Sequence, residues 1–215
     1  MFVDERGFAR QMERLSRRVV GLGSGGRGVA LTFDDAYRSF FEVALPVLER
    51  YGISSTLFVP SGRLGGDNTW DAGTSCDRSL MTPEQVTEAA FRGVGIGSHG
   101  HRHVDLTAVA PEEARADLAA SIEALTALTG RRPRFLAYPW GRHDERVRAL
   151  AAELGFEAAY AVERPSGDRF GRERVQVEAD DGALRFALKA SGAYGRLRSY
   201  RRTLTSTKAS RSTSS

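Results

Sequence analysis

The chain has 215 residues, of which 41% are hydrophobic and 27% charged, enough for one globular domain with a core of ordinary size. Residues 196–215 carry six of the positive charges and no negative one; because the whole chain is at +4, residues 1–195 carry −2, which argues against a basic nucleic-acid-binding body. The single Cys76 excludes an intrachain disulfide. No apolar run approaches the roughly 18 residues of a membrane span, and the N-terminus lacks the apolar core of a secretion signal. We therefore expect a cytoplasmic protein.

Apolar periodicity predicts a helix at the N-terminus, followed by alternating strands and helices. Phe8, Met12, Leu15 and Val19 recur at helical spacing. The expected strands are 29–33, 54–59, 94–98, 135–138 and 158–162, with a sixth at 174–178, and the expected helices lie near 39–51, 83–92, 111–129 and 144–154. Such alternation is typical of an α/β fold, with a parallel sheet or barrel and helices outside it.

Three segments lack this periodicity. The glycine-rich residues 21–26 match a dinucleotide-binding pattern, but they follow a helix and precede a strand, so we interpret them as a flexible loop. Residues 60–81 are rich in turn formers and are expected to form a loop over the mouth of the fold. Residues 196–215 are basic, rich in Ser and Thr and poor in apolar residues, which predicts a disordered tail after a domain of residues 1–195. The alternative for this tail is attachment to anions or nucleic acid.

Two groups of polar residues indicate one divalent metal site. Asp34 and Asp35 follow the apolar strand 29–33, at the end where α/β folds place their chemistry. His99 and His103 are four residues apart, one helical turn, so both imidazoles can face the same point. A carboxylate with two imidazoles leaves one position open for water, as in catalytic zinc sites. His101 points away from that face and is expected in solvent.

Three segments resemble the motifs of the polysaccharide deacetylases, the NodB-homology domain of carbohydrate esterase family 4. They are Thr32-Phe33-Asp34-Asp35, Ser98 through His103, and Ala137-Tyr138-Pro139-Trp140-Gly141. The resemblance covers roughly residues 5–190, and it implies a distorted (β/α) barrel of about seven parallel strands.

The resemblance also implies a role for each matching residue. Asp35, His99 and His103 would hold the metal, and Asp34 would be the general base for the attack of a metal-bound water on an acetyl carbonyl. The backbone N–H of Trp140 would be a second donor to the oxyanion. The ligand types suit Zn²⁺, and also Co²⁺, Ni²⁺ or Mn²⁺.

Substrate contacts are expected at the mouth of the barrel. Trp70 and Trp140 have rings suited to stacking on a sugar, with a structural role at the edge of the core as the alternative for Trp70. Leu106 resembles the family's leucine that lines the acetyl pocket, and plain core is its alternative. Tyr138 and Pro139 of the third motif complete the predicted substrate-binding set.

Four positions depart from the family pattern. Ala36 replaces a glycine, and Gly100 replaces a Ser or Thr that would add a supporting hydrogen bond. Ala137 stands where many members carry an Arg that pairs with the base; we expect Arg174 to replace it, a hypothesis that unchanged turnover in Arg174→Ala would remove. The family's last motif carries a His that protonates the leaving amine, and the chain has no histidine after His143. Either His143 or protonated Asp34 would then be the acid, and we prefer Asp34.

The sequence therefore predicts a metal-dependent hydrolase that removes N-acetyl groups from an amino sugar or glycan. One alternative is an allantoinase-like hydrolase of a non-peptide C–N bond in a small molecule. The other is a catalytically silent sugar-binding domain, which the missing Arg and His would fit.

Overall fold

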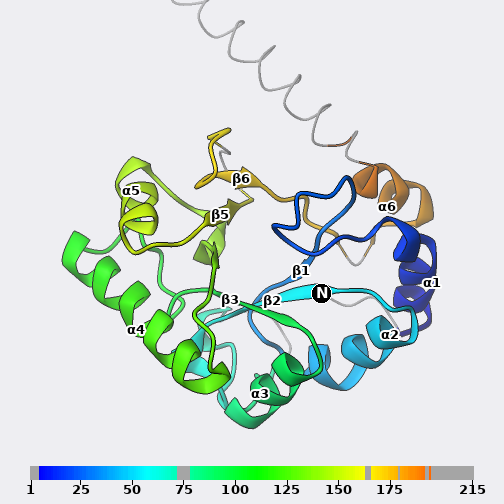
Figure 1. Cartoon of the computed structure of the whole chain (residues 1–215), viewed down its shortest axis with the longest axis horizontal. Helices are drawn as coiled ribbons and strands as arrows, with labels where there is room; N and C mark the ends of the chain where they lie inside the picture. The colour runs from blue at the N-terminus through cyan, green and yellow to red at the C-terminus, as the bar shows by residue number, and fades with distance from the viewer. Residues whose placement is uncertain (1–4, 72–77, 163–165, 179, 192–193, 195–215) are drawn as a thin grey trace, which may run out of the picture.

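A computed structural model describes residues 5–71, 78–162, 166–178, 180–191 and 194 (Figure 1). Cys76 and the predicted tail at 196–215 lie outside the described residues. The strands are β1 (Leu31–Phe33), β2 (Ser55–Val59), β3 (Gly95–Ser98), β4 (Phe135–Ala137), β5 (Ala158–Ala161) and β6 (Arg172–Glu173). The α-helices are α1 (Glu5–Leu15), α2 (Leu45–Arg50), α3 (Pro83–Phe91), α4 (Pro111–Thr129), α5 (Glu145–Glu153) and α6 (Ala183–Ala190).

The six described strands form one parallel sheet in the order β1-β2-β3-β4-β5-β6. Each strand lies beside its neighbour in sequence, and the sheet curls into a half-barrel with the helices on its outer side (Figure 1). This confirms the predicted α/β barrel-like class. Because the strands are parallel and follow one another in order, all their C-terminal ends meet at one edge.

Side-chain alternation along the strands separates an inner core from an outer one. On β2, Phe58 belongs to the inner cluster, whereas Leu57 and Val59 pack against the helices. On β4, Phe135 and Ala137 face inward with Phe58. The inner cluster is therefore a packed aromatic layer beneath the edge at which the strands end.

The sheet differs from the prediction in two respects. The predicted strand at 174–178 is wrong: β6 is formed by Arg172 and Glu173, which pair with Tyr160 and Ala161 of β5. A seventh strand is not found among the described residues. Helix α6 was not among the predicted elements.

Local sequence explains where the helices begin and end. Thr82 caps α3 in a reciprocal capping box with Gln85, and Pro83 occupies the first turn. Helix α4 ends at Gly130, whose φ of +70° is left-handed. Residues Phe40–Ala44 form a π-helical turn that continues into α2, within the region predicted as one helix.

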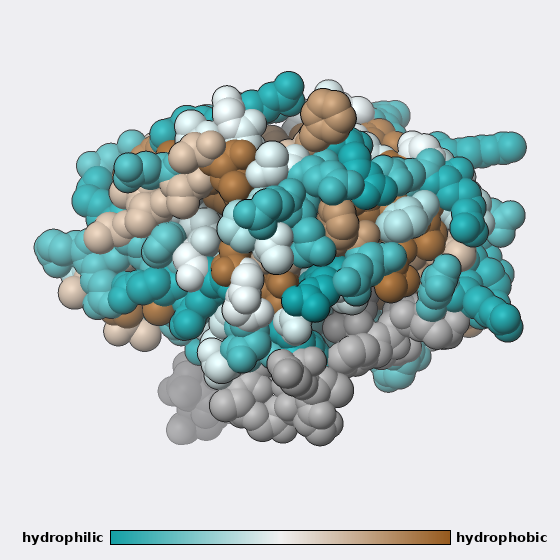
Figure 2. Space-filling model, turned by 90° about the horizontal axis from the view of Figure 1, so that it is seen from below, coloured by the Kyte–Doolittle hydropathy of each residue, from teal (hydrophilic) through white to brown (hydrophobic). Residues whose placement is uncertain are grey.

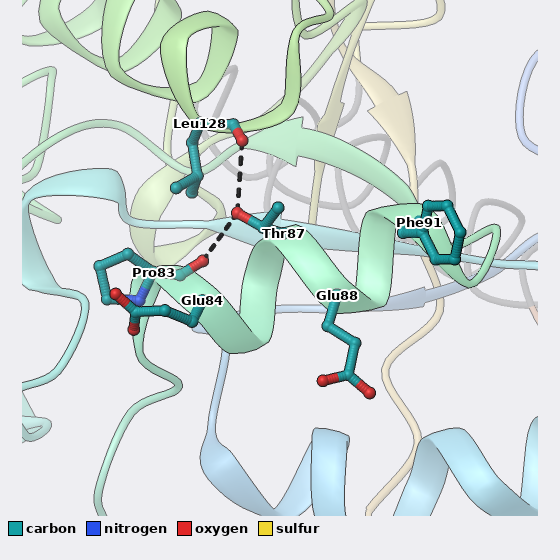
Figure 3. A pocket seen from close by; sticks show the side chains of 6 residues that line it. All are labelled: Pro83, Glu84, Thr87, Glu88, Phe91 and Leu128. Carbon is teal, nitrogen blue, oxygen red and sulfur yellow. Dashed lines mark hydrogen bonds between the residues drawn. The ribbon is translucent and has the colours of Figure 1, made fainter.

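The outer surface of the helix layer has a shallow hollow between α3 and the end of α4 (Figure 3). The Thr87 hydroxyl donates a hydrogen bond to the Pro83 carbonyl at 3.0 Å and lies 3.3 Å from the Leu128 carbonyl, and Phe91 is 91% exposed. None of the predicted site residues lines this hollow.

On the side of the molecule that is lowest in Figure 1, hydrophilic side chains are spread widely and hydrophobic ones form smaller groups between them (Figure 2). Within the described residues, no helix has the length and apolar content needed to cross a membrane.

Candidate active site

The two acidic residues of the first motif leave β1 in an unusual backbone conformation. Asp35 has a φ of +70° and Ala36 a φ of +56°. The other described non-glycine residues with positive φ are His103 (+60°) and Trp140 (+61°), so all four belong to the sequence motifs. Left-handed backbone costs an L-residue about 1–2 kcal/mol, and such strain concentrates at functional sites. Ala36 therefore occupies a position where glycine would be unstrained.

His99 and His103 converge, but not through a helical turn. Residues 99–103 form an irregular loop after β3, with left-handed backbone at Gly100 (φ +75°) and at His103. The two rings lie edge to face, 4.9 Å apart between centroids. The two side chains do lie together, as predicted. The predicted cause, a helical turn between them, is wrong, because residues 99–103 are not helical.

A backbone carbonyl fixes the tautomer of His99. The Nδ1 atom lies 2.8 Å from the carbonyl oxygen of Ala137, at the end of β4. Because a carbonyl only accepts, Nδ1 must carry the hydrogen, and Nε2 of the neutral ring presents its lone pair toward Asp35. Sequence reasoning missed this contact, because Ala137 contributes only its backbone.

Asp35, His99 and His103 fit a divalent metal ion. Their ligand atoms all lie within 4.8 Å of one another. Asp35 Oδ1 is 3.4 Å from His99 Nε2 and 3.2 Å from His103 Nε2, close to the separation of about 3.4 Å for two ligands of a tetrahedral Zn²⁺ ion. This oxygen is buried and has no hydrogen-bond partner among the described residues. The same is true of His103 Nδ1. An ion would satisfy a buried oxygen that the protein leaves unpaired.

The three groups also perturb one another electrostatically. Burial would raise the pKa of Asp35, but His103 and His99 beside it bring this pKa well below its usual range. Burial would lower the pKa of His99, but Asp34 and Asp35 outweigh burial and raise it. The cluster thus concentrates negative charge on carboxylates next to imidazoles, as a cation site requires.

Asp34 faces a different partner. Arg174 donates two hydrogen bonds to it, Nη1 to Oδ1 at 2.6 Å and Nη2 to Oδ2 at 2.8 Å. Arg174 directly follows β6, its side chain is 12% exposed, and its guanidinium lies over the Phe58 ring of the inner cluster. Although burial raises the pKa of Asp34, Arg174 and His99 lower it overall. The two adjacent carboxylates therefore have separate partners, imidazoles for Asp35 and a guanidinium for Asp34.

Both tryptophans lie against the cluster. The centroid of the Trp70 ring is 4.5 Å from that of the His103 ring, and the centroid of the Trp140 ring is 5.2 Å from it. Trp140 is 41% exposed and lies in the 3₁₀ segment Pro139–Gly141. The guanidinium of Arg63 covers Trp70 at 5.7 Å from the ring. The structure thus places aromatic surface around His103.

The remaining predicted substrate contacts are not at the surface of the site. Tyr138 and Leu106 are fully buried in the outer core, and the Tyr138 hydroxyl donates to the Phe170 carbonyl at 2.7 Å. Pro139 is buried as well. The burial of Leu106 and Tyr138 favours a role in the core, which was the alternative for Leu106, and substrate contact by Tyr138 and Pro139 stays a prediction.

The two remaining histidines, His101 and His143, pack against other side chains. His101 is half-buried, and its Nδ1 is 2.9 Å from the Ser61 hydroxyl, so the prediction that it lies free in solvent is wrong. The ring of His143 packs on Tyr138, 5.1 Å between centroids, beside the outer core.

Comparisons with known proteins agree with the motifs and the fold. A family model described as polysaccharide deacetylase matches residues 23–159. YxkH of Bacillus subtilis is 27% identical over 153 residues, 69% of this chain and 51% of that protein. The poly-β-1,6-N-acetyl-D-glucosamine N-deacetylase of Staphylococcus epidermidis is 26% identical over 170 residues, 72% of this chain and 56% of that protein. The chain thus spans about half the length of these relatives.

A solved structure supports the architecture. The Streptococcus pyogenes deacetylase PplD in complex with acetate superposes with a TM-score of 0.75 at 19% identity, and the match covers 87% of each chain. At this identity the similarity shows a shared fold.

Proposed function

The chain belongs to the polysaccharide deacetylase family, and we propose that it is a metal-dependent hydrolase that removes N-acetyl groups from an amino sugar or glycan. The observation that carries this proposal is that two adjacent carboxylates have different partners. Asp35 faces two imidazoles, and Asp34, next to it, is held by Arg174. A site that only bound a cation would not require a second carboxylate with its own guanidinium partner.

The proposed metal ligands are Asp35 Oδ1, His99 Nε2 and His103. A divalent ion held there supplies Lewis-acid chemistry, since it makes water more acidic and polarises a carbonyl group. Zn²⁺ fits this donor set best, and Co²⁺, Ni²⁺ and Mn²⁺ are also compatible with it.

Asp34 is the proposed general base and acid. Its lowered pKa keeps it ionised at neutral pH, and each of its oxygens retains a lone pair beyond the one that Arg174 uses. It can therefore accept a proton from the attacking water. After the proton has been taken up, Asp34 can return it to the nitrogen of the leaving amine. His143 is the weaker candidate for this acid, because its ring packs on buried Tyr138.

The aromatic residues would position the sugar. Trp140 has an exposed ring beside His103, and the Trp70 ring also packs against this imidazole. Stacking of a pyranose on either ring would place the sugar beside His103 and the proposed metal site.

Acetate release from N-acetylglucosamine oligomers tests the proposal. We expect turnover from protein that has been stripped with a chelator and reloaded with Zn²⁺ or Co²⁺, but not from stripped protein. Asp34→Asn should bind metal normally and lose about 10²–10⁴-fold in kcat. Asp144→Asn, which changes the carboxylate that caps α5, is the matched control and should retain activity.

Two outcomes would contradict this function. Hydrolysis of ureides such as allantoin without acetate release would favour the small-molecule amidohydrolase. Bound metal with no turnover of either substrate, and an Asp34→Asn variant indistinguishable from the wild type, would favour a silent binding domain.

A further inference from the structure

A buried carboxylate lies directly behind the loop that carries the two proposed ligand histidines. Asp117 is on α4, and its side chain has no exposed surface. Its Oδ2 accepts the backbone N–H of His101 at 2.8 Å, and its Oδ1 accepts the backbone N–H of Arg102 at 3.1 Å. Oδ1 also accepts Nε–H of Arg102 at 3.1 Å. Within the described residues, every hydrogen bond that this carboxylate accepts comes from residues between the two histidines.

The contact explains the unusual glycine in the second motif. A Cβ atom on Gly100 would lie 2.9 Å from Asp117 Oδ2 and 3.5 Å from Pro139. The carboxylate therefore occupies the space beside residue 100 into which a side chain would project. From the sequence, Gly100 was expected to leave the loop with one supporting hydrogen bond fewer; the structure supplies acceptors from α4 instead.

The loop needs this support because its backbone is not held by regular structure. Residues 99–103 are neither helix nor strand, and Gly100 and His103 have positive φ. Backbone N–H groups that are partly shielded from water are costly to leave without an acceptor, so the conformation that presents both imidazoles depends on an acceptor at this place. Arg102 continues the contact outward to Glu113, 2.8 Å away at the surface.

We propose that Asp117 is a positioning residue that sets the geometry of the proposed metal site by fixing the backbone of residues 101 and 102 between His99 and His103. The inference rests on the proposed function, because it assumes that these histidines bind a metal. None of the hydrogen bonds that Asp117 accepts from the described residues involves a ligand atom of the proposed metal site. Asp117 acts through the loop, whose conformation determines where the two imidazoles point.

Asp117→Asn is the variant that tests this role. Asn has the same shape, but one of its two terminal atoms is an NH2 group that only donates. It therefore cannot accept from both backbone N–H groups, which reach different oxygens of the carboxylate. Glu113→Gln, which changes the exposed partner of Arg102, is the matched control. Gly100→Ala is the second variant: it leaves the carboxylate in place but pushes on it from the loop side.

The readouts are the affinity of the full chain for Zn²⁺, measured by competition with a chromophoric chelator, and the visible spectrum of the Co²⁺-loaded protein. Circular dichroism shows which variants are folded. We expect Asp117→Asn and Gly100→Ala to bind Zn²⁺ about 10–100-fold more weakly and to change the Co²⁺ spectrum. Glu113→Gln should stay within about twofold of the wild type, since exposed ion pairs contribute little.

Wild-type affinity and an unchanged Co²⁺ spectrum in a folded Asp117→Asn variant would overturn the inference and leave the proposed function standing. If that variant does not fold, the same result in Gly100→Ala overturns it. A wild-type chain that binds no metal would instead overturn the proposed function, and this inference with it.

Discussion

Removal of the guanidinium from Arg174 tests the proposed base. Arg174→Met keeps a long side chain that can fill the space over Phe58. It removes two charge-assisted hydrogen bonds to Asp34, at 2.6 and 2.8 Å, and such bonds are worth about 1.5–3 kcal/mol each when buried. Because the Asp34 side chain is 32% exposed, water replaces part of what is lost. We expect the free energy of unfolding to fall by about 1–3 kcal/mol.

The same variant should change the pH dependence of activity. Burial acts to raise the pKa of Asp34, and Arg174 is the main group that lowers it below the ordinary 3.8. Without the guanidinium, this pKa rises. Only the ionised carboxylate can accept a proton, so the acid limb of log kcat/KM should move to higher pH.

The stability of the folded protein gives an independent check of the sign. A carboxyl group whose folded-state pKa is below its unfolded value contributes stability above the unfolded pKa and loses it as the pH falls through the folded pKa. The stability difference between the wild type and Arg174→Met should therefore shrink in acid. Urea unfolding at a series of pH values measures it.

Steady-state kinetics with an N-acetylglucosamine oligomer measures the catalytic effect. We expect kcat to fall about 10–100-fold with little change in KM, less than in Asp34→Asn, where the base itself is removed. Arg174→Lys should be intermediate, because it keeps the charge but loses the bidentate geometry. Arg172→Met, two residues away and exposed, is the control. An unshifted acid limb together with unchanged kcat in Arg174→Met would refute the reasoning.

Two further variants test the packing around the site and at α6. Ala36→Gly should change the free energy of unfolding by no more than about 1 kcal/mol. Glycine relieves the strain of a left-handed alanine, but the buried methyl group is lost and the unfolded chain gains entropy. A large fall in the free energy of unfolding, measured with urea, would show that the positive φ carries no strain. Asp181 is buried and its pKa is lowered, against the effect of burial, by Lys189 at 2.6 Å. Lys189→Met should cost about 2–4 kcal/mol at neutral pH and less in acid, where Asp181 becomes protonated; a cost that does not change with pH would contradict this assignment.

Much of the site could be predicted from the sequence because its carboxylates follow an apolar strand. The apolar run before Asp34 specifies β1, and parallel strands in order bring their C-terminal ends together. That geometry places Asp35 near the loop after β3 without any knowledge of the loop itself. The pairing of Arg174 with Asp34 was also expected, although Arg174 lies after a strand rather than at the start of one.

The support of the site could not be predicted in the same way. Asp117 lies in a helix with several other acidic residues, and nothing in the periodicity distinguishes it from a solvent-exposed side chain. Its partners are backbone amides in a loop with no repeating pattern. Strand β6 was misplaced for a related reason: Arg172 and Glu173 have no strand-like composition, and they become a strand only through pairing with β5.

Metal analysis of the purified protein decides whether one ion is held by Asp35, His99 and His103 while Asp34 stays off the metal. We predict one divalent ion per chain in the wild type and in Asp34→Asn, and its loss in His99→Ala, with all three proteins folded by circular dichroism. Retention of the ion by His99→Ala, or its loss from Asp34→Asn, would contradict this assignment of the two carboxylates.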